Sequence, residues 1–179
     1  MKKTNPLSVR KIEAYANKIR REFNVEVNSH FPIYEILEKM HNDGSLTIQI
    51  MDDNNSIFAD ENELAKYSPI DNFIYVKEKI IVGYEENDYR SNFTLAHEFF
   101  HYIQHKVLEF EFYDVEICKS YEDPEWQANE FAGQLLIPTS FLEYDDEVLC
   151  EMFHVTAECV VTRKLYYKNR KERRGLKSY

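Results

Sequence analysis

Two histidines and a glutamate stand in the order H-E-x-x-H at residues 97–101 of the 179-residue chain. Residues four apart lie one turn above each other on a helix, so the imidazoles of His97 and His101 would project from one face and could bind a single Zn²⁺. Glu98 lies about 100° further round the helix, where its carboxylate could hold a water molecule beside the ion without binding the ion itself. The pattern therefore indicates zinc-dependent hydrolysis, with two histidine ligands and Glu98 as the acid/base.

A catalytic zinc ion takes three protein ligands and leaves a fourth position open, so a third donor must come from another segment. His105 continues the series of histidines, but it lies about 12 Å along the helix from His97, too far for both to bind one ion. Glu125 and Asn129 share one face of a later predicted helix, where a carboxylate could bind the ion and an amide could accept a hydrogen bond from a ligating imidazole. Glu130 is a rival ligand, and Glu125 could instead only favour the helix dipole. From these residues alone the third ligand stays open.

The H-E-x-x-H residues lie within a segment without Gly or Pro, which predicts one long helix from Asp88 to Val107. Its apolar residues recur at helical spacing and form one stripe, namely Phe93, Ala96, Phe100, Ile103 and Val107. Asp123 is a capping residue followed by Pro124 at the first helical position, which predicts the start of a second helix. That helix would run to about Leu136 and stop before Pro138.

The rest of the chain predicts an α+β fold with a small antiparallel sheet. Before the long helix, amphipathic and alternating patterns predict helices over residues 12–23 and 33–40 and strands over residues 46–50, 73–76 and 80–84, the last two as a hairpin. The polar segment 52–71 is expected to be a loop or a weak helix. After the second ligand helix, residues 146–168 predict a helical stretch with a break near His154, where Thr156 would cap a new helix.

Charge is distributed unevenly along this acidic chain, whose formal net charge is −10. Residues 1–22 hold seven basic and two acidic residues, and residues 163–179 hold eight basic and one acidic residue. The residues between them hold seven basic and 29 acidic residues, a net charge of −22. Such an acidic body could attract a basic partner. The basic tail from Arg163 to Lys177 could contact nucleic acid, or it could only be solvated and neutralise the body, so direct nucleic-acid binding stays open.

The apolar segments and the cysteines indicate a cytoplasmic protein. The first sixteen residues hold no apolar block of the kind found in signal peptides. The longest uncharged run, residues 131–142, has 12 residues and contains Pro138, so we expect no segment that spans a membrane. The three cysteines, Cys118, Cys150 and Cys159, have no spacing typical of a metal site and suit a reducing compartment.

Three runs of this sequence together resemble the ImmA/IrrE family of metallopeptidases. They are F-T-L-A-H-E-F-F-H-Y at residues 93–102, E-W-Q-A-N-E-F-A at residues 125–132 followed by L-L-I-P, and F-H-V-T at residues 153–156 with Arg163 and Leu165 further on. The resemblance extends from about residue 8 to residue 168 and implies a gluzincin-like fold. We expect a zincin-like metallopeptidase domain over residues 1–138 and a helical, helix-turn-helix-like C-terminal segment with a basic tail over residues 139–179.

By matching positions, the resemblance implies one Zn²⁺ per chain, bound by His97, His101 and Glu125. It also implies that Glu98 is the catalytic acid/base and that Asn129 orients a ligating histidine from outside the ligand set.

Members of this family are known as proteases that act on a helix-turn-helix repressor in the regulation of mobile elements or stress responses. The resemblance implies a zinc endopeptidase of the shorter, antirepressor type, and we expect the substrate backbone to pair with the predicted edge strand 80–84. One alternative is a non-enzymatic regulator that binds a repressor or DNA through its C-terminal helices. Another is a purely structural zinc site, but such sites are usually rich in cysteine, and no cysteine is suitably spaced here.

Overall fold

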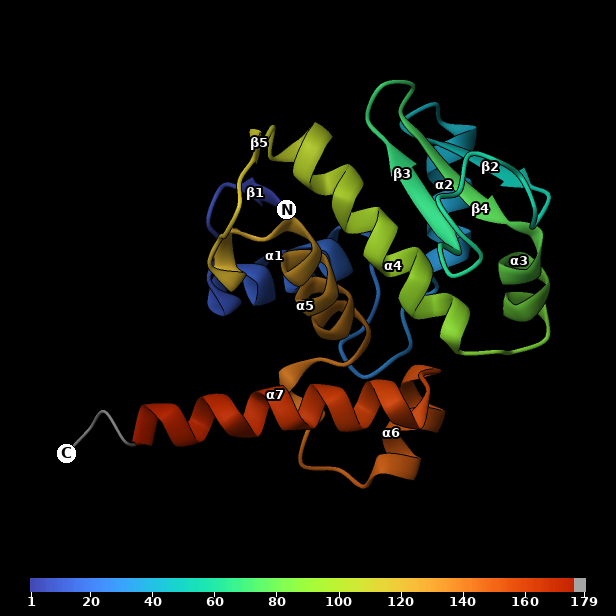
Figure 1. Ribbon diagram of the computed structural model, residues 1–179. Helices are drawn as coiled ribbons and strands as arrows, with labels where there is room; N and C mark the ends of the chain where they lie inside the picture. Colours follow the sequence, from blue (N-terminus) through green and yellow to red (C-terminus); the bar gives the residue numbers. More distant parts are fainter. Residues whose placement is uncertain (176–179) are drawn as a thin grey trace.

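The chain folds into a body of packed helices with a small sheet on one side and a pair of helices at its C-terminal end (Figure 1). The structure is a computed structural model, and it describes the backbone of residues 1–175 and the side chains of residues 1–172. In chain order the elements are β1 (Lys2–Thr4), α1 (Val9–Glu22), α2 (Ile33–Asn42), β2 (Thr47–Met51), β3 (Ala65–Ser68), β4 (Phe73–Lys77), α3 (Glu78–Glu85), α4 (Arg90–Tyr102), a π-helical turn (Ile103–Val107), β5 (Phe112–Asp114), a 3₁₀ turn (Ser120–Glu122), α5 (Pro124–Leu136), a second 3₁₀ turn (Thr139–Phe141), α6 (Asp146–Phe153) and α7 (Ala157–Gly175). Of the helices described, none combines the length and the hydropathy that a membrane span requires.

Helices α4 and α5 form the centre of the hydrophobic core. Phe100 of α4 stacks on Phe131 of α5, with ring centroids 4.4 Å apart and an interplanar angle of 22°. Ala96 of α4 and Ala128 of α5 are also fully buried, and small side chains let helices approach closely. Burying the two phenylalanine side chains contributes about 3–6 kcal/mol to folding. This contact therefore holds the two predicted ligand helices in a fixed relation.

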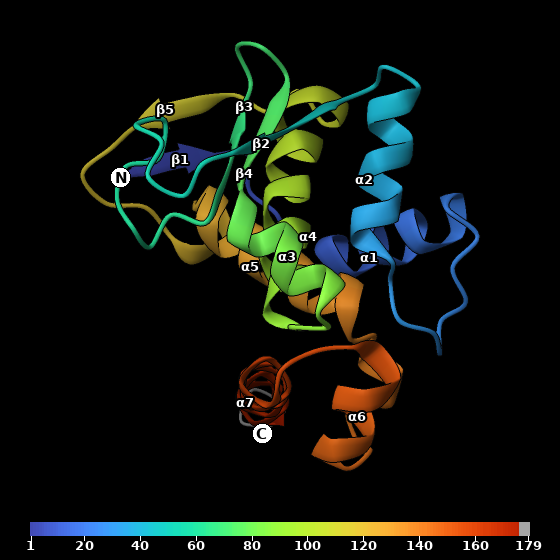
Figure 2. The same ribbon diagram turned by 90° about the vertical axis from the view of Figure 1, so that its right-hand side faces the viewer.

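The small sheet has the strand order β2–β4–β3, with β2 parallel and β3 antiparallel to the central strand β4. The predicted α+β class is confirmed, but the sheet is mixed and not purely antiparallel. The parallel pair is sterically feasible because a long connection, which contains β3, joins β2 to β4. Figure 2 shows this sheet beside α4, with α2 and α3 near it. A separate two-stranded sheet pairs β1 with β5.

The predicted strand over residues 80–84 is wrong, because this segment lies in helix α3. A short run of apolar, β-branched residues suits either a buried strand or a turn of buried helix. Here Ile80 and Ile81 are buried while Val82 is 43% exposed, which is helical and not strand periodicity. Both edges of β4 are occupied by β2 and β3, so no place remains beside it for a hairpin partner.

Strand β3 lies in the polar segment where we expected a loop or a weak helix. Its residues Ala65 and Tyr67 are buried and alternate with less buried polar residues. Alanine and lysine are depleted in strands, so the local signal for this strand is weak. The loop before it is fixed by Lys77, whose buried amine donates hydrogen bonds to the carbonyl oxygens of Asp60 and Glu61 at 3.1 Å. The strand is thus specified by tertiary contacts.

Helices α6 and α7 meet at a break, as predicted. His154 takes a left-handed conformation with a φ of 51° and ends α6. The hydroxyl of Thr156 accepts a hydrogen bond from the Cys159 amide at 3.2 Å, which caps the start of α7. The carbonyl oxygen of His154 accepts a hydrogen bond from the Asn92 side chain of α4 at 2.8 Å, so the break is tied to α4.

Helix α7 is held to α5 by a buried ionic cluster around Glu130. The Glu130 carboxylate lies 2.9 Å from Arg170 Nη1 and 3.7 Å from Arg163 Nη1, and the Glu130 side chain is 5% exposed. Arg163 is itself buried and donates a hydrogen bond to the Thr139 hydroxyl at 2.9 Å. The expectation of a solvated or nucleic-acid-binding tail from Arg163 onwards is therefore wrong for Arg163, whereas Lys177 lies outside the described residues.

Ending the chain after residue 162 should destabilise the fold, because the buried Glu130 carboxylate would lose both arginine partners. Leaving a buried charge unpaired costs about 3–5 kcal/mol, so the midpoint of urea unfolding should fall clearly. A chain that ends after residue 172 keeps Arg163 and Arg170 and serves as the control, with a midpoint close to that of the full chain. Equal midpoints for the two shortened chains would show that the ionic cluster contributes nothing to stability.

Candidate metal centre

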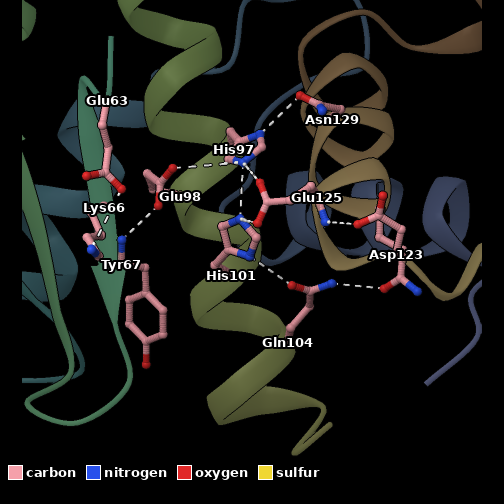
Figure 3. Close-up of polar contacts among 11 residues, drawn as sticks. Glu63, Lys66, Tyr67, His97, Glu98, His101, Gln104, Asp123, Glu125 and Asn129 are labelled. Atoms are coloured by element: carbon pink, nitrogen blue, oxygen red, sulfur yellow. Dashed lines mark hydrogen bonds and ion pairs between the residues drawn. The ribbon is translucent and has the colours of Figure 1, made fainter. Parts of the chain in front are cut away.

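Three side chains of α4 and one of α5 meet in an open cleft between α4, α5 and β3 (Figure 3). The cleft has a volume of 660 Å³; His97, Glu98 and His101 line it from α4, and Glu125 enters it from α5. The histidines share a face of α4 because they lie one turn apart, while the two phenylalanines between them are buried in the core. The structure thus brings together the four residues expected to form the site.

The donor atoms have the spacing of ligands around one zinc ion. The two imidazole Nε2 atoms lie 3.1 Å apart, and the Glu125 carboxylate oxygens lie 3.2 Å from His97 Nε2 and 3.4 Å from His101 Nε2. Two ligands bound at about 2.0–2.1 Å in a tetrahedral arrangement are separated by about 3.3 Å. Imidazole nitrogens and a carboxylate are also a donor set that catalytic zinc accepts. The residues present therefore fit a zinc ion.

The first turn of α5 determines where Glu125 lies. The Asp123 side chain accepts a hydrogen bond from the Glu125 amide at 3.0 Å, and Pro124 begins the helix, as predicted. Glu130, the rival ligand, pairs with Arg170 instead. Of the two carboxylates, only that of Glu125 contacts the imidazoles, so the geometry favours Glu125 as the third ligand.

The carboxylates and the imidazoles perturb each other's protonation. Hydrogen bonds from His101 and then from His97 hold the pKa of Glu125 well below its usual range, although partial burial opposes this shift. Burial alone would lower the pKa of His101, but the hydrogen bond to Glu125 and the charge of Glu98 raise it above its usual value. The negative potential at the cleft therefore favours a bound cation.

Glu98 is oriented by the edge strand β3. Its Oε2 accepts a hydrogen bond from the Tyr67 amide at 2.7 Å, whereas its Oε1 lies 3.9 Å from His97 Nε2. By distance alone Glu98 is also a candidate donor, because it lies with His97 and His101 in a group whose ligand atoms are within 4.8 Å of one another. Glu125 is closer to both imidazoles, which leaves Glu98 free for proton transfer. Burial raises the pKa of Glu98 despite the opposing charges of the two imidazoles, and a carboxyl group that holds a proton more readily suits this role.

A chain of buried amides fixes the protonation of His101. Gln127 donates hydrogen bonds from Nε2 to the carbonyl oxygens of Asn5 and Tyr121, at 2.8 and 2.9 Å. Its own oxygen therefore accepts, and it does so from Gln104 Nε2 at 2.9 Å. The Gln104 oxygen then faces His101 Nδ1 at 3.0 Å. It follows that Nδ1 carries the proton and that Nε2, which faces the cleft, is free to bind a metal.

The other imidazole has the outer partner that we expected. His97 Nδ1 lies 3.1 Å from Asn129 Oδ1, one turn beyond the ligand position on α5. Gln104 and Gln127, in contrast, were not identified from the sequence. Gln104 lies three residues after His101, a spacing that brings side chains together on a helix, so a signal for it existed. Gln127 reaches across from another helix, and no local pattern indicates it.

The end of α4 differs from the prediction of one continuous helix to residue 107, because α4 ends at Tyr102 and the π-helical turn Ile103–Val107 follows. Such turns often occur at functional sites. This one brings His105 to the wall of the cleft, where its ring stacks on Phe112 with centroids 4.0 Å apart. Burial lowers the pKa of His105 to about 4. Within the described residues His105 lies outside the donor group, in line with the distance argument.

The fold and the arrangement of donors define a zincin-like α+β protein with a site of the metallopeptidase type. The chain belongs to the peptidase M78 family, because the family model described as the IrrE N-terminal-like domain matches residues 47–163. This range includes both ligand helices, and it confirms the resemblance to the ImmA/IrrE family.

A similar solved structure is described as a Mycobacterium tuberculosis transcriptional regulator. It has a TM-score of 0.54 and 19% sequence identity, and the alignment covers 84% of this chain and 45% of that chain. At this identity the likeness shows the fold alone, and the present chain spans less than half of the regulator's length. The comparison with curated proteins gave no match.

We expect the purified protein to bind one zinc ion per chain and the His97→Ala variant to lose it, because the variant lacks one of three converging donors. Metal analysis after dialysis measures the zinc content. His105→Ala, which removes a histidine from the same cleft outside the donor group, is the matched control and should keep the metal. Equal zinc contents for wild type and His97→Ala would rule out this site.

Gln104→Leu should weaken zinc binding about 10- to 100-fold, because the Nδ1–H of His101 would lose its acceptor and the imidazole its fixed orientation. Competition with a chelator of known affinity measures this effect. Gln134→Leu removes another buried amide that does not contact an imidazole, and it should leave zinc affinity unchanged. Equal losses in both variants would indicate a general effect on folding and not an effect on the ligand.

Proposed function

We propose that this protein is a zinc-dependent endopeptidase. The observation that carries the proposal is the convergence of two imidazole nitrogens and one carboxylate within 3.4 Å, beside a second carboxylate at 3.9 Å that is not needed as a ligand. Zinc held by His97, His101 and Glu125 would supply a Lewis acid that polarises a peptide carbonyl and acidifies a water molecule. Membership of a peptidase family supports the same chemistry.

Glu98 is suited to the proton transfers of peptide hydrolysis. The Tyr67 amide occupies Oε2, so Oε1 is the oxygen left to act in the cleft. From there Oε1 can take a proton from the attacking water and deliver it to the leaving amine. The raised pKa of Glu98 favours the first step, because the carboxylate is then a stronger base toward the attacking water, and the carboxyl group holds this proton until the amine leaves.

The open edge of β3 is suited to bind the substrate backbone. The Leu64 carbonyl accepts a hydrogen bond from the Lys77 amide of β4 at 3.0 Å, and bonding alternates along an antiparallel pair. The backbone groups of Ala65 and Tyr67 therefore face away from β4, and the bond from the Tyr67 amide to Glu98 supports this orientation. An extended peptide added to this edge would pass beside Glu98. In this proposal β3 takes the role that we had expected for the segment now seen as α3.

We further propose that the substrate is a helix-turn-helix repressor and that cleavage releases the genes it represses in the cytoplasm. The net charge of −22 over residues 23–162 supports a basic, DNA-binding substrate, because opposite charge speeds encounter. The similar solved structure is described as a transcriptional regulator, which is consistent with a regulatory role.

The alternative of a non-enzymatic regulator that acts through its C-terminal helices has weaker support. Two of the basic side chains of α7, Arg163 and Arg170, are engaged with Glu130 and are therefore unavailable for DNA or a partner. A protein that only binds a repressor or DNA would also not need Glu98 to be oriented by the Tyr67 amide.

The Glu98→Gln variant should keep its zinc but lose cleavage of its helix-turn-helix repressor substrate by at least about 100-fold, because an amide cannot accept the water's proton. Gel analysis of the purified repressor, incubated with loaded enzyme, measures cleavage. Glu63→Gln makes the same change elsewhere in the cleft and should retain activity. Proteolysis retained by Glu98→Gln would mean that another group accepts the proton, and binding of the repressor without cleavage by the wild type would favour the regulator alternative.

A further inference from the structure

A second cavity, of 480 Å³, lies between α4, α5 and α7. We call it the α7 pocket; its walls include Phe93, Trp126, Gly133, Thr162, Arg163 and Tyr166. Gly133 lets α7 approach α5 closely, because a Cβ at this position would lie only 3.2 Å from Arg163 Cδ. The C-terminal helix thus supplies one wall of a cavity whose other walls come from the two ligand helices.

The α7 pocket adjoins the cleft that holds His97, His101 and Glu125. Phe93 and Thr94 of α4 line both cavities. Asn129, whose side chain bonds His97, also lines the α7 pocket. Phe93 precedes His97 by four residues, about 6.0 Å along the helix, which is shorter than two residues of extended peptide, about 6.6 Å. A peptide in the metal cleft can therefore place the side chain of a residue next to the scissile bond into the α7 pocket.

The walls of the α7 pocket suit an apolar side chain. Three aromatic rings, those of Phe93, Trp126 and Tyr166, face a space large enough for a leucine or phenylalanine side chain. Among the buried charged groups of the pocket, Glu130 pairs with Arg163 and Arg170. Two nitrogens of Arg163, Nε and Nη1, are buried without a hydrogen-bond partner, so an acidic side chain is the competing occupant, although burying its charge would be costly. The aspartate peptide in the first test below distinguishes the two.

The direction of β3 indicates which side of the scissile bond is involved. In Figure 3, β3 passes from Lys66 to Tyr67 in the same direction as α4 passes from His97 to His101. A peptide that pairs antiparallel with β3, the more stable arrangement, runs in the opposite direction. Its carboxyl-terminal part then lies over the start of α4, where Phe93 opens into the α7 pocket.

We propose that the α7 pocket is a specificity site that receives a bulky apolar side chain, that of the first substrate residue after the scissile bond. This proposal rests on the proposed endopeptidase function and adds the chemical class of the residue that the enzyme selects. It also gives α7 a part in substrate selection.

The first test measures cleavage of blocked peptides that differ only in the residue after the scissile bond. Wild-type enzyme should show a kcat/KM at least about tenfold higher for leucine or phenylalanine than for alanine or aspartate at that position. Thr162→Phe fills the α7 pocket from α7 and should abolish this preference, so that the leucine and phenylalanine peptides are cleaved no faster than the alanine peptide. Val161→Phe adds the same ring at the neighbouring position, which is exposed and does not line the pocket, and it should keep the preference. A preference only for residues before the scissile bond, or one that Thr162→Phe leaves intact, would overturn the proposal.

The second test does not depend on catalysis. Trp126 is the only tryptophan of the chain and lines the α7 pocket, so its fluorescence reports what enters. In the zinc-loaded Glu98→Gln variant, the leucine and phenylalanine peptides should shift the emission of Trp126, the alanine peptide should not, and Thr162→Phe should remove the response. If the wild type cleaves no peptide but these shifts occur, the endopeptidase function fails and the assignment of the pocket stands. Emission that is the same with all the peptides would overturn the assignment.

Discussion

The close packing of α4 on α5 is the constraint on which the site depends. Two imidazole nitrogens and the Glu125 carboxylate come from helices far apart in the sequence, yet they lie within 3.4 Å of each other. The stacked rings of Phe100, which directly precedes His101, and Phe131 hold the two helices together, so the hydrophobic core sets the distance between the donors. Holding this much negative charge around one point is costly without a cation, and the low pKa of Glu125 shows how strongly the cluster favours positive partners. The contact between Phe100 and Phe131 stabilises the fold and so offsets the cost of holding the charged groups close together.

Polar contacts around the donor residues fix the orientation and the protonation of the two imidazoles. Each imidazole has its Nδ1 beside an amide oxygen, Asn129 for one and Gln104 for the other. Both Nε2 atoms are therefore directed toward the cleft in the form that binds a metal. The amide chain behind Gln104 ends on two backbone carbonyl oxygens, which can only accept, so its direction is fixed by the fold and not by the metal. Glu98 is fixed in a different way, by a backbone amide of the strand that is suited to hold the substrate.

The sequence predicted the parts of this arrangement that depend on spacing along one element. The H-E-x-x-H pair, the Asp123 cap with Pro124 and the break before α7 all follow from local rules, and the structure has them where expected. The predictions from the sequence were wrong where contacts with other elements decide the secondary structure. Residues 80–84 have the composition of a strand but form a helix, because both edges of β4 are taken. Local sequence gives almost no signal for strand β3 or for the role of Gln127. The loop before β3 is held by the hydrogen bond from Lys77 to the Asp60 carbonyl, and Gln127 contacts Gln104 from another helix. The residues alone left the choice between Glu125 and Glu130 open, because it depends on which face of α5 meets α4; only the family resemblance pointed to Glu125.

Helix α7 is linked to the donor residues through α5, although its own side chains do not contact them. Asn129, which contacts His97, and Glu130, which binds α7, are successive residues of α5, so the two move as parts of one helix. A displacement of α7 would have to break the bonds from Arg163 and Arg170 to a carboxylate that is buried, and it would open the wall that contains Thr162. The energetic cost of leaving that carboxylate unpaired resists such a displacement. Although part of α7 extends beyond the body in Figure 1, its first half is therefore an integral wall of the α7 pocket.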